Sequence, residues 1–247
     1  MDNDYQLELS AIKYLDFLNS PNGQTQKKVL ADAILKVLPK NPRSAILDAG
    51  CGPGWLAANL KKHCQSVEAC DSSDFLIKVA KVEFPNINFQ VADLNKPLPY
   101  LKNFFDCVIL NMVAPDLGAP DGAFKNLCAV LKPDGKLIIT IPNPRLTYPA
   151  AVWKRGVLGF ILRQKPQLKI KNPPLEGKKI QREFGENIKI GSYYHSLPYY
   201  IQTAKNAGLK LKQQQEIKSQ TDSPNFDLTY QLYRYPLILL LEFEKRT

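Results

Sequence analysis

The sequence lacks the long apolar runs of a membrane-spanning protein. Its longest candidate, Pro236–Leu241, is much shorter than the ~20 apolar residues that a transmembrane helix needs. The N-terminal residues MDNDYQLELS start acidic and lack the basic and then apolar pattern of a signal peptide. We therefore expect no transmembrane segment and no export signal.

The sequence also has few cysteines. The five cysteines form no C-x-x-C pair, and most of them lie in apolar stretches: Cys51, Cys64, Cys70, Cys107 and Cys128. An odd number without metal-ligand spacing predicts free thiols in a reducing compartment, with neither a disulfide framework nor a zinc site. A cytoplasmic protein is the expectation.

Positive charge is abundant, but it is concentrated in one segment. The 247 residues include 33 Lys and Arg against 23 Asp and Glu, which gives a formal charge of +10. Residues 144–190 hold eleven of the basic residues and three of the acidic ones, so +8 of that charge lies there. The segment also contains five prolines, and an apolar run, Val157–Leu162, next to Trp153. Such an excess suggests nucleic acid or an anionic surface as a partner.

Outside this basic segment, apolar strand-like stretches alternate with helix-compatible ones. This alternation indicates a parallel sheet covered by helices on both faces, a doubly wound α/β domain. We expect an N-terminal helical extension (residues 1–43), and the basic segment (144–190) as an insertion after the fifth strand. The predicted strands are Ser44–Asp48, Ser66–Asp71, Ile87–Ala92, Asp106–Val113, Lys136–Ile141, Leu209–Ile217 and Leu237–Glu244; the predicted helices are Trp55–His63, Asp74–Phe84, Gly122–Leu131 and Leu197–Ala207.

The most informative stretch is the glycine cluster after the first predicted strand. It reads LDAGCGPGW, with the spacing D-x-G-x-G-x-G counted from Asp48. Glycines between a strand and a helix let a ligand approach the backbone, and the N–H groups at the helix start attract an anion. The dinucleotide fingerprint G-x-G-x-x-G does not fit, because it requires glycine where this chain has Trp55.

Two further acids lie at the ends of the next two predicted strands: Asp71 ends the second strand, and Asp93 follows the third. Asp71 comes 23 residues after Asp48, and Asp93 comes 22 residues after Asp71. Each is one strand–helix unit further on, so the three carboxylates should meet at the carboxyl edge of the sheet, where such folds bind ligands. A carboxylate there can accept hydrogen bonds from a ribose diol or from an exocyclic amine. Either Asp71 or Asp93 alone could equally be a helix cap or a loop acid; the three together favour a binding site.

With these residues in place, the sequence resembles the class I S-adenosylmethionine-dependent methyltransferases. The run ILDAGCGPG is similar to their first motif, and the similarity continues through VEACDSS, FQVADL, FFDCVILNMV and LKPDGKLIITIP. It covers roughly residues 44–142 and 193–246. The resemblance implies a Rossmann-like sheet of seven strands, mostly parallel with an antiparallel last strand. It also implies S-adenosyl-L-methionine as the cofactor and S-adenosyl-L-homocysteine as the product.

The resemblance also implies roles for individual residues at the cofactor. The glycines would shape the loop around the methionine part, with Asp48 near the amino group. Asp71 and Ser72 would hold the ribose hydroxyls. Asp93 would accept a hydrogen bond from the adenine amino group, and the backbone of Leu94 would contact the adenine ring. The complete set of predicted cofactor residues is Asp48, Gly50, Gly52, Gly54, Asp71, Ser72, Asp93, Leu94 and Asn111, the last beside the sulfonium.

His195 is the candidate general base, because methyl transfer requires the acceptor to lose a proton and imidazole is suited to removing it. It stands in GSYYHSLPY, which looks like a segment that many small-molecule methyltransferases carry before their last large helix. A helix-entry histidine whose ring satisfies a nearby carbonyl is the equal alternative. The other histidine, His63, ends the first helix after the glycines, where a solvated role is expected.

Aromatic residues near the expected acceptor side have two open interpretations. Tyr193, Tyr194, Tyr199 and Tyr200 either wall an apolar acceptor pocket or belong to the core. Tyr5 and Tyr14 of the N-terminal extension either close over the cofactor or lie at the surface.

The basic segment also stays open between several interpretations. It suits a substrate lid over an apolar or anionic small molecule, or a nucleic-acid contact. Residues 153–171 suit a peripheral membrane contact, and a solvated loop without a partner is the plainest alternative. No recognised RNA-binding module is present, and Asn111-Met112-Val113-Ala114 is not the N-P-P-Y or D-P-P-Y tetrapeptide of amino-group methylation.

The sequence therefore predicts a methyltransferase that acts on an oxygen or carbon of a small, apolar or anionic metabolite. The alternative is an RNA (tRNA) or protein methyltransferase that contacts its substrate through the basic segment. A chain that binds the cofactor without acceptor chemistry is disfavoured, since the glycines and all three acids are present.

Overall fold

The structure is a computed structural model that describes residues 8–147, 150–156, 160–162, 164–184, 188–225 and 227–246. Tyr5 and the Val157–Gly159 part of the apolar run, singled out above, lie outside the described residues.

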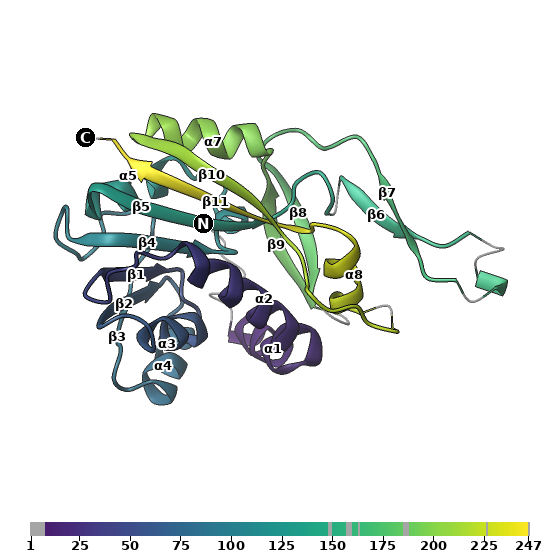
Figure 1. Ribbon diagram of the computed structural model, residues 1–247, viewed down its shortest axis with the longest axis horizontal. Coiled ribbons are helices and arrows are strands. Elements are labelled where there is room, and N and C mark those ends of the chain that lie inside the picture. Colours follow the sequence, from purple (N-terminus) through teal and green to yellow (C-terminus); the bar gives the residue numbers. More distant parts are fainter. Residues whose placement is uncertain are drawn as a thin grey trace.

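A seven-stranded sheet forms the centre of the molecule, in the order β10-β11-β5-β4-β1-β2-β3 (Figure 1). Strands β1 to β5 pair in parallel, whereas β11 runs antiparallel to both β5 and β10. This confirms the predicted doubly wound sheet with an antiparallel last strand. The strands are β1 (Ala45–Ala49), β2 (Ser66–Asp71), β3 (Asn88–Val91), β4 (Phe105–Asn111), β5 (Leu131–Pro142), β10 (Leu209–Ile217) and β11 (Ile238–Lys245).

Helices cover both faces of this sheet, and each face has its own apolar core. On one face α5 (Asp121–Val130) and α7 (Leu197–Asn206) pack through side chains such as Phe124 and Tyr200. On the other face lie α2 (Pro21–Val37), α3 (Trp55–Lys61) and α4 (Asp74–Glu83), with Ile34, Leu60 and Ile77 in their core. Because both faces are covered, the central strands are mostly apolar, and all five residues of β1 are buried.

The N-terminal extension is part of the domain core. Its first helix, α1 (Glu8–Asn19), ends just before Ser20, whose side chain caps α2 by accepting a hydrogen bond from the backbone N–H of Gly23. Helix α2 then supplies Leu30 and Ile34 to the core and contacts α8 (Leu228–Arg234).

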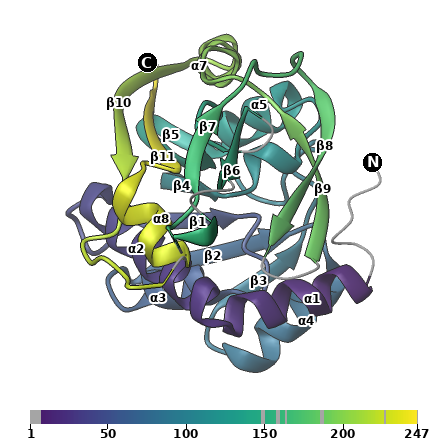
Figure 2. The same cartoon turned by 90° about the vertical axis from the view of Figure 1, so that its right-hand side faces the viewer.

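The basic segment forms two hairpins, where the sequence predicted no strand. Strands β6 (Ala151–Lys154) and β7 (Gln167–Ile170) form the first, which Figure 1 shows extending away from the sheet. Strands β8 (Lys178–Phe184) and β9 (Ile188–Tyr194) form the second. In Figure 2 this second hairpin lies above α1, and β9 contacts both α1 and the short 3-10 helix η2 (Ala114–Asp116). Within the basic segment, the first hairpin therefore extends away from the sheet, whereas the second packs against α1 and η2.

All five cysteines are free and buried, and burial raises the pKa of each thiol. Among the described residues, no helix has the length and apolar character to cross a membrane. The described part of the chain also brings together no group of His, Cys, Asp and Glu side chains that could hold a metal ion.

Candidate functional site

The glycine loop between β1 and α3 adopts a backbone that other residues would strain. Gly50, Gly52 and Gly54 have φ angles of 75°, 53° and 85°, in the left-handed region that glycine enters without cost. A Cβ added to Gly50 would lie 2.4 Å from Cγ2 of Val113, so the loop packs directly against the residues that follow β4. A Cβ on Gly52 would instead meet only Cε1 of Tyr14, at 3.6 Å, which places α1 over the loop.

Asp71 ties this loop to the end of β2. The backbone N–H of Gly52 donates to its Oδ2 at 2.8 Å, and the backbone N–H of Ser73 donates to its Oδ1 at 2.9 Å. Burial raises the pKa of Asp71, and these two hydrogen bonds partly offset that rise. Each carboxylate oxygen has a second lone pair, so Asp71 can still accept hydrogen bonds from a diol.

Asp48 is a buried carboxylate that has no partner within the described residues. It lies at the end of β1 with 1% of its surface exposed, and neither oxygen receives a hydrogen bond. Burial, and then the charge of Asp71, raise the pKa of Asp48 to about 7. An unpaired buried carboxylate is costly, and a bound ammonium group would relieve that cost. The amino group of S-adenosylmethionine is such a group, so the residues present fit this cofactor.

The ends of β3 and β4 complete the edge. Asp93 accepts a hydrogen bond from the backbone N–H of Asn95 at 2.9 Å, and the carbonyl of buried Leu94 accepts one from Asn126 Nδ2 at 2.9 Å. At the end of β4, Oδ1 of Asn111 accepts a hydrogen bond from Thr140 Oγ1 at 2.6 Å, which fixes the orientation of the Asn111 amide.

Ser72 lines a surface cavity of about 370 Å³ next to α1, together with Glu8, Ser73 and Phe75. The structure thus brings every predicted cofactor residue to the carboxyl ends of four adjacent strands, β3, β2, β1 and β4. Their contacts with a cofactor stay a prediction.

His195 lies at the junction of β9 and α7, with 3% of its surface exposed. Its Nε2 is 3.2 Å from the carbonyl oxygen of Leu117, and its ring stacks on Tyr199 with centroids 4.5 Å apart. Its Nδ1 has no hydrogen bond within the described residues and lies 3.7 Å from Oε2 of Glu176. Burial lowers the pKa of His195, although Leu117 and Glu176 act in the opposite direction.

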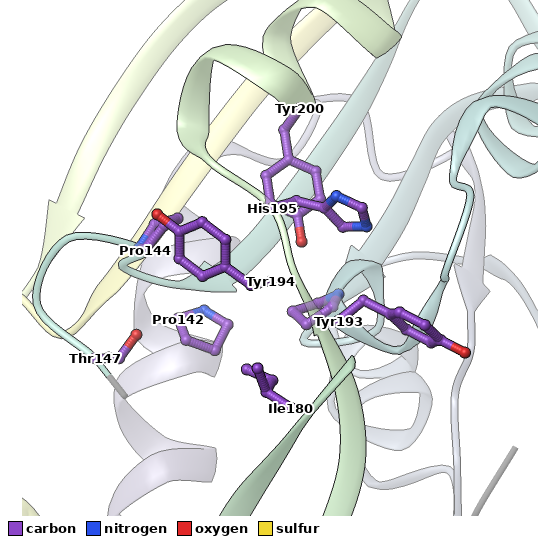
Figure 3. A pocket seen from close by; sticks show the side chains of 9 residues that line it. Pro142, Pro144, Thr147, Ile180, Tyr193, Tyr194, His195 and Tyr200 are labelled. Carbon is purple, nitrogen blue, oxygen red and sulfur yellow. The ribbon is translucent and has the colours of Figure 1, made fainter. Parts of the chain in front are cut away.

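A small cavity lies beside this histidine (Figure 3). Tyr193, Tyr194 and Tyr200 line it together with His195 and Pro142. Its volume is about 30 Å³, room for about two water molecules. Tyr199 is not among the lining residues. Tyr200 is also a buried part of the core, and whether these tyrosines contact an acceptor stays a prediction.

Two acidic residues of this region, Glu176 and Asp116, were not predicted from the sequence as part of the site. Glu176 accepts a hydrogen bond from the backbone N–H of Ser196 at 2.9 Å and reaches His195 only because the β8–β9 hairpin folds the chain back. Asp116 accepts a hydrogen bond from Ser192 Oγ at 2.9 Å, and its charge raises the pKa of Asp71. No local sequence signal marks either residue, because both act through contacts between segments distant in the chain.

Comparison with known proteins identifies the fold and a family that matches the central part of the chain. Residues 47–139, which include the glycine loop and Asn111, match the family described as "Methyltransferase domain". A solved S-adenosylmethionine-dependent methyltransferase from Mesorhizobium loti has a TM-score of 0.68 at 20% identity, over 87% of this chain and 96% of that one. A putative S-adenosylmethionine-dependent methyltransferase from Listeria monocytogenes gives 0.67 at 20% identity, over 89% and 99% of the two chains.

The chain thus has the fold of solved S-adenosylmethionine-dependent methyltransferases, and its residues 47–139 match the methyltransferase-domain family. Among curated proteins, a ubiquinone biosynthesis O-methyltransferase from Coxiella burnetii is 36% identical over 104 residues, which are 40% of this chain and 43% of that protein. A demethylmenaquinone methyltransferase from Paenarthrobacter aurescens is 28% identical over 153 residues, 60% of this chain and 56% of that protein. The matches therefore span about half the length of these relatives.

Proposed function

We propose that this chain transfers a methyl group from S-adenosyl-L-methionine to an oxygen or carbon of a small, apolar or anionic metabolite. The observation that carries the proposal is the buried carboxylate of Asp48, which has no hydrogen-bond partner among the described residues. It lies at the end of β1, beside a loop in which three glycines have left-handed backbone conformations. Such a carboxylate would bind the cationic group of a ligand that lies along the backbone of the glycine loop.

The residues at the sheet edge would hold the cofactor at several of its polar groups. Asp48 would pair with its amino group, Asp71 and Ser72 with the ribose hydroxyls, and Asp93 with the adenine amino group. The carboxylate–ribose contact would also fix the glycine loop, because Asp71 accepts the backbone N–H of Gly52. When bound, the cofactor supplies a methyl group that its sulfonium activates, and Asn111, oriented by Thr140, would lie beside it.

The acceptor side favours a small molecule. The names of relatives refer to ubiquinone biosynthesis, demethylmenaquinone and, for a protein of Halalkalibacterium halodurans that is 33% identical over 117 residues, malonyl-acyl-carrier protein. The wall beside His195 is mainly tyrosine and proline, side chains that suit contact with an apolar part of an acceptor, and the cavity of about 30 Å³ has room for only a small part of one. The β8–β9 hairpin would act as the lid over this side, since β9 packs on η2 and α1.

His195 would serve as the general base through Nδ1. With Nε2 held by the carbonyl of Leu117, the neutral tautomer carries its proton on Nε2 and leaves Nδ1 able to accept one. Glu176, 3.7 Å from Nδ1, would stabilise the imidazolium that forms. The contact with Leu117 equally suits a purely structural histidine that fixes the start of α7, so a variant must decide between these roles.

Methyl-labelled S-adenosylmethionine tests the proposal directly. The protein is incubated with the label and separate pools of small metabolites, RNA and protein. We expect label in the metabolite pool; label confined to RNA or protein, or no label in any pool, would contradict the proposal.

His195→Gln should lower turnover by about 100-fold or more, as expected for a lost general base, with S-adenosylhomocysteine affinity unchanged. His63→Gln is the matched control, because His63 is exposed at the end of α3. Turnover that survives His195→Gln would assign the histidine to the structural role.

A further inference from the structure

The first hairpin of the basic segment has a fixed base and an exposed tip. At the base, Trp153 packs edge-on against Tyr235 with ring centroids 5.4 Å apart, and Leu168, its partner across the hairpin, joins the same core. Lys165 donates a hydrogen bond to the carbonyl of Ser223 at 2.9 Å. These contacts hold the hairpin to the region around α8 while its end extends into solvent (Figure 1).

The tip presents large apolar side chains to solvent. Phe160, Ile161 and Leu162 are 72%, 67% and 56% exposed, and Ile170 at the base of β7 is 68% exposed. Adjacent exposed apolar residues of this kind mark an interaction surface.

Cations lie along the first hairpin from its base to its tip, and its sequence contains no acid to balance them. Lys154, Arg155, Lys169 and Lys171 are all exposed, and the guanidinium of Arg155 lies 5.9 Å from the ring centroid of Phe160. The sequence contains no Asp or Glu from residue 135 to residue 175. The hairpin is therefore apolar at its end, and the charged side chains along it are all basic.

We propose that this hairpin is a membrane-docking arm, whose tip Phe160–Leu162 enters an anionic lipid surface while Lys154, Arg155, Lys169 and Lys171 contact the lipid head groups. Apolar tips with flanking cations bind at the boundary between acyl chains and head groups, and each basic residue near an anionic surface adds to the attraction. Two aliphatic side chains at the tip gain little from a nucleic-acid backbone, and two arms of the same charge repel each other, so a lipid surface fits better than RNA or a second copy.

Vesicle co-sedimentation with the whole protein tests the arm. We expect binding to phosphatidylcholine vesicles that contain phosphatidylglycerol, weaker binding to phosphatidylcholine alone, and a decrease as salt is added. The triple variant Phe160→Ser, Ile161→Ser, Leu162→Ser and the double variant Lys154→Glu, Arg155→Glu should each bind the anionic vesicles at least about tenfold more weakly.

The matched control is Val82→Ser with Leu101→Ser, which removes two exposed apolar side chains elsewhere on the surface (85% and 74% exposed). This control should bind vesicles as the unaltered protein does. Thermal unfolding should show that every variant is folded, because the altered side chains are exposed.

Three results would overturn the proposal. They are no binding to anionic vesicles, equal binding by the tip variant and the unaltered protein, or loss of self-association or RNA binding in the tip variant without any change at vesicles. None of these readouts involves methyl transfer, so failure of the arm and failure of the proposed enzyme activity are distinguishable.

Discussion

The cofactor edge and the basic segment are built in opposite ways. At the edge, backbone and side chains pack so closely that Gly50 leaves no room for a Cβ, and Asp48 is 1% exposed. In the basic segment, Gly156 has no atom within 4 Å of an added Cβ, and Phe160 is 72% exposed. A closely packed edge is what the proposed cofactor site requires, and an exposed tip is what the proposed membrane-docking arm requires.

The largest difference between the two regions is expected when one glycine in each is replaced by alanine. Gly50→Ala should lower the free energy of unfolding by about 3 kcal/mol or more, since it combines a left-handed backbone with a 2.4 Å contact to Val113. Gly156→Ala should change it by less than about 0.5 kcal/mol. Urea unfolding of both variants measures this; equal losses would show that the two regions do not differ in packing.

A second prediction concerns the buried carboxylate at the edge. Because the pKa of Asp48 in the folded chain is raised from 3.8 to about 7, the folded state holds a proton that the unfolded state releases between these pH values. The free energy of unfolding should therefore fall as pH rises through this range, by at most about 1.4 kcal/mol per pH unit.

Asp48→Asn should remove this part of the pH dependence and raise stability relative to the unaltered protein by about 2 kcal/mol near pH 8. Urea unfolding at several pH values measures the slope. Glu83→Gln, at an exposed acid on α4, is the control. An unchanged slope in Asp48→Asn would show that Asp48 does not carry the buried charge.

The smallest effects on stability are expected in the first hairpin of the basic segment, where a substitution at the base should cost more than one at the tip. Trp153→Ala should cost about 1–2 kcal/mol, because half-buried Trp153 packs on Tyr235. Phe160→Ala should cost less than about 0.5 kcal/mol. Thermal unfolding compares the two, and a large loss for Phe160→Ala would mean that the tip is packed in solution.

The sequence predicted the sheet and its edge well, because the signals are local. Buried strands appear as continuous apolar runs, and β2 and β10 have the predicted bounds. Asp48, Asp71 and Asp93 lie at or just past the carboxyl ends of their strands, so chain spacing alone places them at one edge.

The hairpins of the basic segment and the environment of His195 could not be predicted in the same way. Prolines and charges in residues 144–190 obscure the strands, which depend on distant partners such as Tyr235 for Trp153 and Asp116 for Ser192. The chain between Glu176 and His195 brings the two together only after the hairpin has formed. Long-range contacts of this kind leave no periodic pattern in the sequence.

Calorimetric titration with S-adenosylhomocysteine tests the central claim, a cofactor site at the carboxyl edge. The unaltered protein should bind one equivalent, and Asp71→Ala should bind at least about 100-fold more weakly, because it loses charge-assisted hydrogen bonds to the ribose. Glu83→Ala, at the exposed acid on α4, should bind as the unaltered protein does. Absence of binding to the unaltered protein, or equal affinity in a folded Asp71→Ala variant, would contradict the account.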